Sequence, residues 1–306
     1  MRKIRFIAML SCAVALAGCG TPRSGTTPGP TRVVRDDLGR RVVIPRTPRR
    51  IVCTSPEMTE VLFAVGAGDR VVGVSRGCDW PPAARRLPLV GDFSNVSGER
   101  VVALKPDLVV ATGHEQSRIV AQLERFRLPV VAYMPADIAG VRRDITAVGD
   151  IVGKREEARK VLAAFDAELA AVDGRVAAVP YNRRPRVYLE ISPEPLMTVA
   201  RGSFVHEVIE RAGGVNIGAD LVRPYCRIDS EEVIGANPDV IISCHGGASP
   251  AAIRARPGWN AITAVRAGRV YDVDPDLVLR AGPRLSRGIA TLYRLFYASP
   301  KAGEGL

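Results

Sequence analysis

Histidine is scarce in this sequence, with three residues among 306. A receptor for zinc or manganese ions needs several histidines and carboxylates converging on one site, so this scarcity argues against that class. The sequence also lacks a Gly-x-Ser-x-Gly elbow, a P-loop, a Gly-x-Gly-x-x-Gly motif and a His-Glu-x-x-His motif. We therefore expect no enzyme, no catalytic residue, no metal site and no resident cofactor. An exported enzyme is a distant alternative, because α/β lobes host many chemistries.

Long hydrophobic runs are also missing, and the longest stands at the N-terminus. Positive charges in residues 1–5 precede an apolar run at 6–16 that is too short to span a bilayer, a pattern typical of an export signal over residues 1–18. The run ends in Leu16-Ala17-Gly18-Cys19, which resembles the lipobox of bacterial lipoproteins. The resemblance implies lipid attachment at Cys19 and a membrane-anchored protein on the extracytoplasmic face. An ordinary signal with a chance cysteine is the alternative.

Residues 20–31 are rich in Gly, Pro, Thr and Ser, so we predict a flexible tether over residues 19–32. Four cysteines follow it, none in a CxxC or Cys/His metal spacing: Cys53, Cys78, Cys226 and Cys244. Export permits disulfides, but the sequence allows three pairings and does not choose between them.

Positive charge is in excess but diffuse. Removing residues 1–18 takes away three positive charges and no acids, which lowers the formal net charge from +11 to +8. The arginines are scattered and form no stripe interleaved with aromatic residues, so we expect no nucleic-acid partner. A solvated surface is the default interpretation, and anionic lipid headgroups beside a tethered protein are a second one.

Alternating apolar strands and helices predict an α/β fold. A hairpin is expected at 33–44, followed by strands and helices in two sets. The predicted strands are 51–54, 71–74, 108–111, 130–133, 187–191, 240–243 and 270–273, and the predicted helices are 57–65, 99–104, 117–126, 204–212, 231–236 and 285–296. The strands are apolar without alternation, as a parallel sheet covered on both faces requires.

An internal repeat relates the two sets. The pattern of Phe93–Ala111 returns at Tyr225–Ser243 with a displacement of 132 residues and no gap, which pairs Glu99 with Glu231. Between the sets, residues 138–179 are strongly helical with an interruption at Gly153, and an apolar stripe follows it. We predict an N-terminal lobe at 33–140, a linking helical region at 141–179, a C-terminal lobe at 180–298 and a tail at 299–306.

Several motifs occur in an order that resembles the substrate-binding proteins of bacterial importers for iron-siderophores, haem and cobalamin. They are the lipobox, the Asp-Leu-Gly-Arg hairpin, Arg50–Glu60, Val72-Gly-Val-Ser75, Asp79-Trp-Pro-Pro82, Glu99 with Lys105–Val110, and Gly202–Gly214. The family fold implied is two Rossmann-like α/β lobes joined by one long rigid helix, with the ligand in the cleft between them. Within the family, Cys78-Asp-Trp-Pro-Pro82 looks most similar to the cobalamin-binding members. The resemblance implies a monomer that captures a corrinoid, or else a ferric siderophore or haem, and delivers it to an ABC importer permease dimer.

The resemblance also assigns ligand-binding positions. Carried over residue by residue, the pocket aromatics of the cobalamin binders fall on Gly77, Phe93, Thr112, Met197, Tyr225 and Leu277, of which two are aromatic here. That loss weakens the corrinoid reading. Trp80 is a further candidate, or else a loop ring stacked on its neighbouring prolines. Arg76, Arg201, Arg227 and Arg280 are expected to reach the cleft, where guanidinium groups suit a catecholate iron complex.

In the same family a glutamate on each lobe forms a salt bridge with permease arginines, and the matching positions here are Glu99 and Glu231. Simple interaction with the dipole of the helix is the alternative role. His114 and His245 follow two corresponding strands and are either loop hydrogen-bonding residues or axial ligands of a metal centre. His206 is expected to be structural, and Trp259 to lie in the core.

Overall fold

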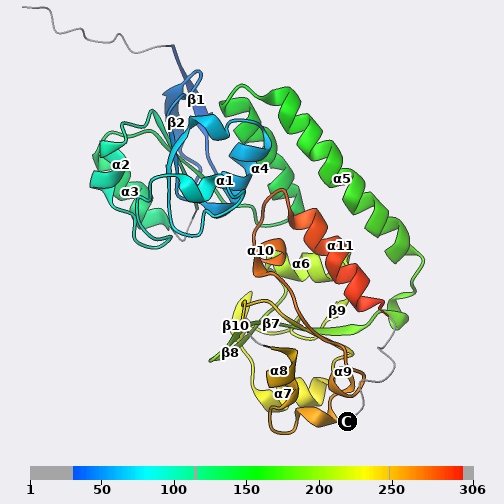
Figure 1. The fold of residues 1–306 in the computed structure, drawn as a ribbon. Coiled ribbons are helices and arrows are strands. Elements are labelled where there is room, and N and C mark those ends of the chain that lie inside the picture. The colour runs from blue at the N-terminus through cyan, green and yellow to red at the C-terminus, as the bar shows by residue number, and fades with distance from the viewer. Residues whose placement is uncertain (1–29, 114–115, 248, 299–306) are drawn as a thin grey trace, which may run out of the picture.

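The computed structural model describes residues 30–113, 116–247 and 249–298 (Figure 1). The predictions for the signal, for Cys19, for His114 and for the tail at 299–306 lie outside these residues. Within the described ranges, no helix combines the length and the apolar character needed to cross a membrane. The strand β1 begins at Thr31, so the last two residues of the predicted tether are paired in a hairpin.

The N-terminal lobe consists of that hairpin and a parallel sheet in the order β4-β3-β5-β6. Three strands are buried at every residue, as their unbroken apolar sequences predict. The elements are β1 (Thr31–Arg35), β2 (Arg41–Pro45), β3 (Ile51–Cys53), α1 (Pro56–Ala64), β4 (Val71–Val74), α2 (Gly98–Ala103), β5 (Leu108–Thr112), α3 (Ser117–Arg125) and β6 (Val130–Tyr133).

Two helices connect the lobes. The first, α4 (Ile138–Ile151), is capped by Asp137, whose Oδ1 accepts from the Gly140 N–H at 2.6 Å. Gly153, with a φ of +69°, separates it from α5 (Arg155–Ala177), as the sequence predicts. The stripe residues Phe165, Leu169, Val172 and Val176 are buried. The helix α5 runs beside both lobes (Figure 1) and packs on α4 and α11.

The C-terminal lobe has a mixed sheet in the order β10-β8-β7-β11-β12, with β9 also paired to β7. The β7–β11 and β11–β12 pairs are parallel, whereas β8 pairs antiparallel with both neighbours. The elements are β7 (Arg186–Pro193), β8 (Leu196–Val199), α6 (Phe204–Arg211), β9 (Val215–Asn216), β10 (Tyr225–Arg227), α7 (Ser230–Ala236), β11 (Val240–Ser243), α8 (Pro250–Arg254), α9 (Thr263–Arg266), β12 (Val270–Asp272), α10 (Pro275–Val278) and α11 (Leu285–Phe296).

The internal repeat corresponds to a repeated structural unit. Asp107 precedes β5, and its carboxylate accepts from the backbone N–H of Arg50 at 2.9 Å. Asp239 precedes β11, and its carboxylate accepts from the backbone N–H of Arg186 at 2.8 Å. Each aspartate thus ties the start of one central strand to the start of its neighbour. The predicted fold class, two α/β lobes joined by a long helix, is confirmed.

Candidate functional site

A cavity of about 660 Å³ lies between the two lobes. Residues from both lobes line it: Pro56, Glu57, Phe93, Thr112, Gly113, Met134, Pro135, Ala136, Gly202, Ser203, Phe204, Arg223, Pro224, Tyr225, Leu279, Arg280 and Ala281. The N-terminal lobe contributes the carboxyl ends of β5 and β6, which is where parallel α/β sheets hold their ligands. A pocket of this size with mostly apolar walls suits a bulky organic ligand.

Phe93 is held in the wall by Gln116, which is fully buried. The Gln116 Nε2 donates to the Phe93 carbonyl at 2.7 Å and to the Thr54 carbonyl at 3.0 Å. Its Oε1 accepts from the Thr54 hydroxyl at 2.7 Å and from the Thr112 N–H at 3.2 Å. One side chain therefore joins the Phe93 loop to the ends of β3 and β5.

The opposite wall comes from the C-terminal lobe. Tyr225 begins β10 and pairs with Val199 at the end of β8, and it is 44% exposed. Phe204 begins α6, whose first turn is fixed because the Ser203 hydroxyl accepts from the His206 N–H at 3.1 Å. The two predicted aromatic residues of the repeat, Phe93 and Tyr225, thus line one cavity from different lobes.

Charged groups lie at three points of the cavity lining. Glu57 stands in the first turn of α1, and Arg223 is exposed just before β10. Arg280 is engaged, because its Nη1 donates to Asp79 Oδ1 at 2.9 Å and its Nη2 lies 2.9 Å from Asp276 Oδ1. Burial lowers the pKa of Arg280, but its carboxylate partners outweigh this and raise the pKa above its usual value. The cavity lining therefore carries one carboxylate and two guanidinium groups.

Apart from Thr112, the other predicted ligand residues do not line this cavity. Thr112 does line it, but its hydroxyl donates to the Tyr133 carbonyl at 3.3 Å. Arg76 forms an exposed ion pair with Asp92 at 2.5 Å, and Gly77 stands beside the Pro56 ring with a φ of +93°. Met197 lies in β8 opposite Arg227. Arg201 pairs with Asp220 at 3.2 Å on the surface.

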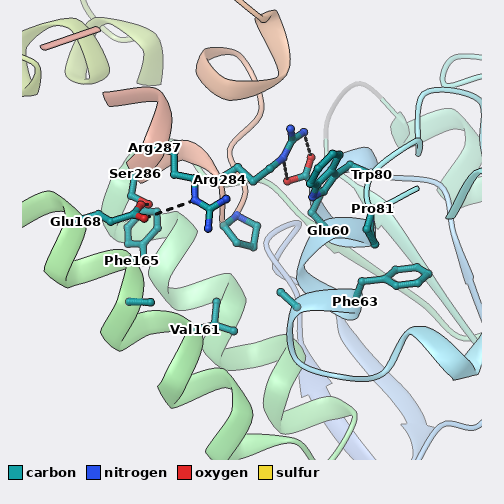
Figure 2. A pocket seen from close by; sticks show the side chains of 13 residues that line it. Glu60, Phe63, Trp80, Pro81, Val161, Phe165, Glu168, Arg284, Ser286 and Arg287 are labelled. Atoms are coloured by element: carbon teal, nitrogen blue, oxygen red, sulfur yellow. Dashed lines mark hydrogen bonds and ion pairs between the residues drawn. The ribbon is translucent and has the colours of Figure 1, made fainter. Parts of the chain in front are cut away.

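Trp80 lines two adjoining cavities beside α5, one of about 410 Å³ (Figure 2) and one of about 770 Å³, and Leu277 lines the second. The Arg284 guanidinium is 4.6 Å from the centroid of the Trp80 ring, a cation–π contact. Trp80 thus contacts an arginine of the other lobe, and its role as a ligand contact stays a prediction. Leu277 belongs to α10, and its carbonyl packs against Gly288 of α11.

An ion-pair network beside these cavities joins the two lobes. Glu60 of α1 is 3% exposed, and its two oxygens accept from Arg284 Nη2 at 2.6 Å and Nε at 2.9 Å (Figure 2). Arg280 Nη1 lies 3.4 Å from the same carboxylate. Burial, the largest effect, raises the pKa of Glu60, and the arginines oppose it. We name Glu60, Arg280 and Arg284 the inter-lobe clamp.

The remaining histidines and Trp259 have structural surroundings. His245 Nε2 is 3.0 Å from the buried Glu190 carboxylate, which Arg256 also binds through two hydrogen bonds. His206 Nδ1 is 3.3 Å from Asn216 Nδ2. Trp259 is fully buried, which confirms its predicted place in the core. The four cysteines beyond the predicted tether are free. Among the described residues, no group of three or more His, Cys, Asp or Glu side chains is placed to hold a metal ion.

Glu99 and Glu231 are exposed in the first turns of α2 and α7. Other side chains cap these helices: Ser97 accepts from the Arg100 N–H, and Asp229 and Glu232 form a capping box. Within the described ranges, neither the Glu99 carboxylate nor the Glu231 carboxylate has an ion-pair or hydrogen-bond partner. In Figure 1, α2 and α7 lie away from α5, one on each lobe.

The residues of the site that sequence reasoning missed include Gln116, Met134, Phe204 and Arg223. The Gly-Ser pair before Phe204 is a helix-start signal that places this ring at an N-terminus, and helix N-termini of α/β lobes point at ligands. No comparable signal marks Gln116, because its partners are set by tertiary structure.

Known proteins resemble this chain over most of its length. The family profile described as "Periplasmic binding protein" matches residues 51–277. The uncharacterized ABC transporter substrate-binding lipoprotein YvrC of Bacillus subtilis (strain 168) is 33% identical over 304 residues, covering 95% of each chain. The periplasmic haem-binding protein BhuT with two haems is 30% identical with a TM-score of 0.74, covering 82% of this chain and 98% of that one. The vitamin B12-binding protein BtuF of Vibrio cholerae is 27% identical with a TM-score of 0.72, covering 83% and 98%.

Proposed function

Because the chain belongs to the periplasmic binding protein family, as the substrate-binding component of an ABC importer and not an enzyme, we propose that it captures a corrinoid of the cobalamin type. The observation that carries this proposal is the pair of apolar walls facing one cavity. Phe93 and Met134 come from one lobe, and Phe204 and Tyr225 from the other. Two such walls suit the two faces of a flat macrocycle. The likeness to a vitamin B12-binding protein supports the same ligand.

Haem or a ferric siderophore is the second candidate. Arg223 and Arg280 line the same cavity, and guanidinium groups suit the carboxylates of haem or the oxygens of an anionic iron complex. The likeness to a haem-binding protein is of similar strength to that of the B12 binder, with TM-scores of 0.74 and 0.72. Arg280 is already paired with Asp79 and Asp276, so Arg223 would be the arginine that binds the anionic groups of haem or a siderophore.

The proposed function includes delivery to the membrane. We propose that Glu99 and Glu231 dock on the two halves of a permease dimer, because each carboxylate is exposed on an equivalent helix of its own lobe. Cys19 is the proposed lipid anchor, and the mature protein is proposed to act as an extracytoplasmic monomer. The likeness to a substrate-binding lipoprotein supports the anchor.

A ligand screen tests the proposal. The purified mature chain is incubated separately with cobalamin, haemin and ferric siderophores, and the absorption spectrum of the protein peak is recorded after gel filtration. We expect cobalamin to co-elute, and Phe93→Ala or Tyr225→Ala to weaken its binding about tenfold or more through lost apolar contact. Tyr181→Ala is the matched control, because Tyr181 is 63% exposed outside the cavity. Co-elution of haemin or a siderophore without cobalamin would assign the second candidate instead.

A further inference from the structure

The hairpin β1–β2 has an outward face that the lobe does not use. Its exposed residues alternate with inward ones, and Val33 and Val43, which pair directly across the strands, are 50% and 59% exposed. On the inward side Ile44 is fully buried. Because side chains alternate between the faces of a strand, the outward set cannot be buried without losing the inward one.

Two arginines with like charge also face each other on this outward side. Arg35 pairs with Arg41 in the register of the hairpin, and like charges directly opposite destabilise a strand pair. In the part of the chain that the structure describes, neither guanidinium has an ion-pair partner. The inward arginines differ, because Arg32 pairs with Asp150 and Arg40 with Asp36.

The two arginines border a hollow of about 520 Å³ lined by Val33, Val34, Arg35, Gly39 and Arg41. An anion seated there would relieve the repulsion between the two guanidinium groups, and apolar groups beside it would contact Val33. Guanidinium groups recognise phosphate oxygens with particularly good geometry. The hollow therefore combines the chemistry of a phosphate group with that of an apolar neighbour.

The position of the hairpin in the chain identifies the source of that phosphate. The hairpin begins at Thr31, and the eleven residues 20–30 separate it from the proposed lipid site at Cys19. A flexible linker of this length has an end-to-end distance of about 20 Å, and about 40 Å is its extended limit. The hairpin is thus the part of the folded protein that the anchor holds nearest to the membrane.

We propose that the outward face of the β1–β2 hairpin binds the headgroups of anionic phospholipids. This inference rests on the proposed membrane location. Arg35 and Arg41 bind headgroup phosphates, and Val33 and Val43 lie against the interface beside them. The contact gives the tethered protein a preferred orientation, with the hairpin toward the lipid.

Vesicle flotation of the mature chain carrying Cys19→Ser, which has no lipid, tests the contact. We expect binding to vesicles of phosphatidylglycerol and phosphatidylcholine at low salt, and loss of binding at high salt or on pure phosphatidylcholine. The double variant Arg35→Ser with Arg41→Ser should bind about 30-fold more weakly, or about fivefold for each arginine.

The control removes the same charge elsewhere. Arg254 and Arg266 are exposed on α8 and α9, at the other end of the molecule from the hairpin in Figure 1. The variant Arg254→Ser with Arg266→Ser should bind vesicles like the parent chain. Equal losses of vesicle binding in both variants would show a net-charge effect and overturn the proposal. Binding by the Arg35 and Arg41 variant as strong as that of the parent chain would overturn it too. If the parent chain sediments as a dimer and the hairpin substitutions make it a monomer, the outward face would instead bind a second copy of the chain. The assay contains no importer ligand, so its outcome is independent of the ligand screen.

Discussion

At the residue scale, Asp144 of α4 is a carboxyl group in unfavourable surroundings. It is 1% exposed, and within the described residues neither of its oxygens has a hydrogen-bond partner. Arg143 Nε is 3.7 Å away, while the carboxylates of Asp37, Glu57 and Asp137 add repulsion. Burial is the largest effect, and together these causes raise the pKa of Asp144 to about 7.

The consequence is a free energy of unfolding that falls as pH rises from about 4 to about 7. A raised carboxyl pKa means that the folded state binds the proton more tightly than the unfolded state, so the contribution is full below the unfolded pKa of about 4 and is lost by pH 7 to 8. We predict that Asp144→Asn is increasingly stabilising, relative to the parent chain, between pH 5 and pH 8. The difference in free energy of unfolding should change by about 3 kcal/mol over this range, because pH 5 lies about two units below the folded pKa, and urea denaturation measures it.

An exposed carboxylate provides the comparison. The side chain of Asp220 is 95% exposed, so Asp220→Asn should differ from the parent chain by the same amount at both pH values. A constant effect of Asp144→Asn across this range would show that Asp144 keeps an ordinary pKa.

The sequence predicted some residues of the site and not others. Phe93 and Tyr225 line the cavity because the repeat places each at the same point of its unit, just before an equivalent helix. Trp80 was not predictable in the same way, since its partner Arg284 lies in the other lobe, more than two hundred residues away. The same holds for Gln116, whose contacts reach residues 62 positions back in the chain. Sequence patterns carry local information, and these contacts are not local.

At the scale of elements, the inter-lobe clamp is where helices of the two lobes meet. Glu60 lies on α1 and Arg284 at the start of α11, and the carboxylate is buried between two arginines. Removing one member of a buried ion pair leaves an uncompensated charge, which costs about 3 to 5 kcal/mol. We predict a loss of this size for Glu60→Ala in urea denaturation. The double variant Glu60→Leu with Arg284→Met should recover much of it, because both charges are then gone.

The exposed pair Arg142–Asp166 is the matched control, with an N–O distance of 2.7 Å and partners 47% and 38% exposed. Solvent screens such a pair, so Asp166→Ala should cost about 1 kcal/mol or less. If Glu60→Ala were no more costly than Asp166→Ala, the clamp would not hold the lobes together.

The elements that the sequence predicted are those with an unambiguous pattern. The stripe of α5 and the apolar runs of β5, β6 and β11 identify them. The observed bounds of β6 and β11 equal the predicted ones, and those of β5 and α5 lie within two residues of them. The prediction missed β8, β9, β10, α8, α9 and α10, which have two to five residues each. Segments this short show no full period, and their structure depends on neighbouring elements.

At the scale of the whole molecule, the two lobes are variants of one unit, and α5 runs beside both of them (Figure 1). Each unit begins with an aromatic residue at the cavity, and the helix that follows carries an exposed glutamate in its first turn. One short segment in each lobe therefore contributes an aromatic side chain to the cavity and a carboxylate to the outer surface. This arrangement lets a ligand between the lobes and a two-fold symmetric partner be recognised by related residues.

The docking proposal predicts that ligand binding and delivery are separable. In the double variant Glu99→Ala with Glu231→Ala, ligand affinity should stay within about twofold of the parent value, because neither residue lines the cavity. Stimulation of ATP hydrolysis by the reconstituted importer should be lost, since each exposed carboxylate that faces a permease cation is removed. Glu156 and Glu157 provide the control, because they also stand in the first turn of a helix, α5, and their replacement by Ala should leave the stimulation unchanged. Full stimulation by the Glu99 and Glu231 variant, or weakened ligand binding with normal stimulation, would place the permease contact elsewhere on the lobes.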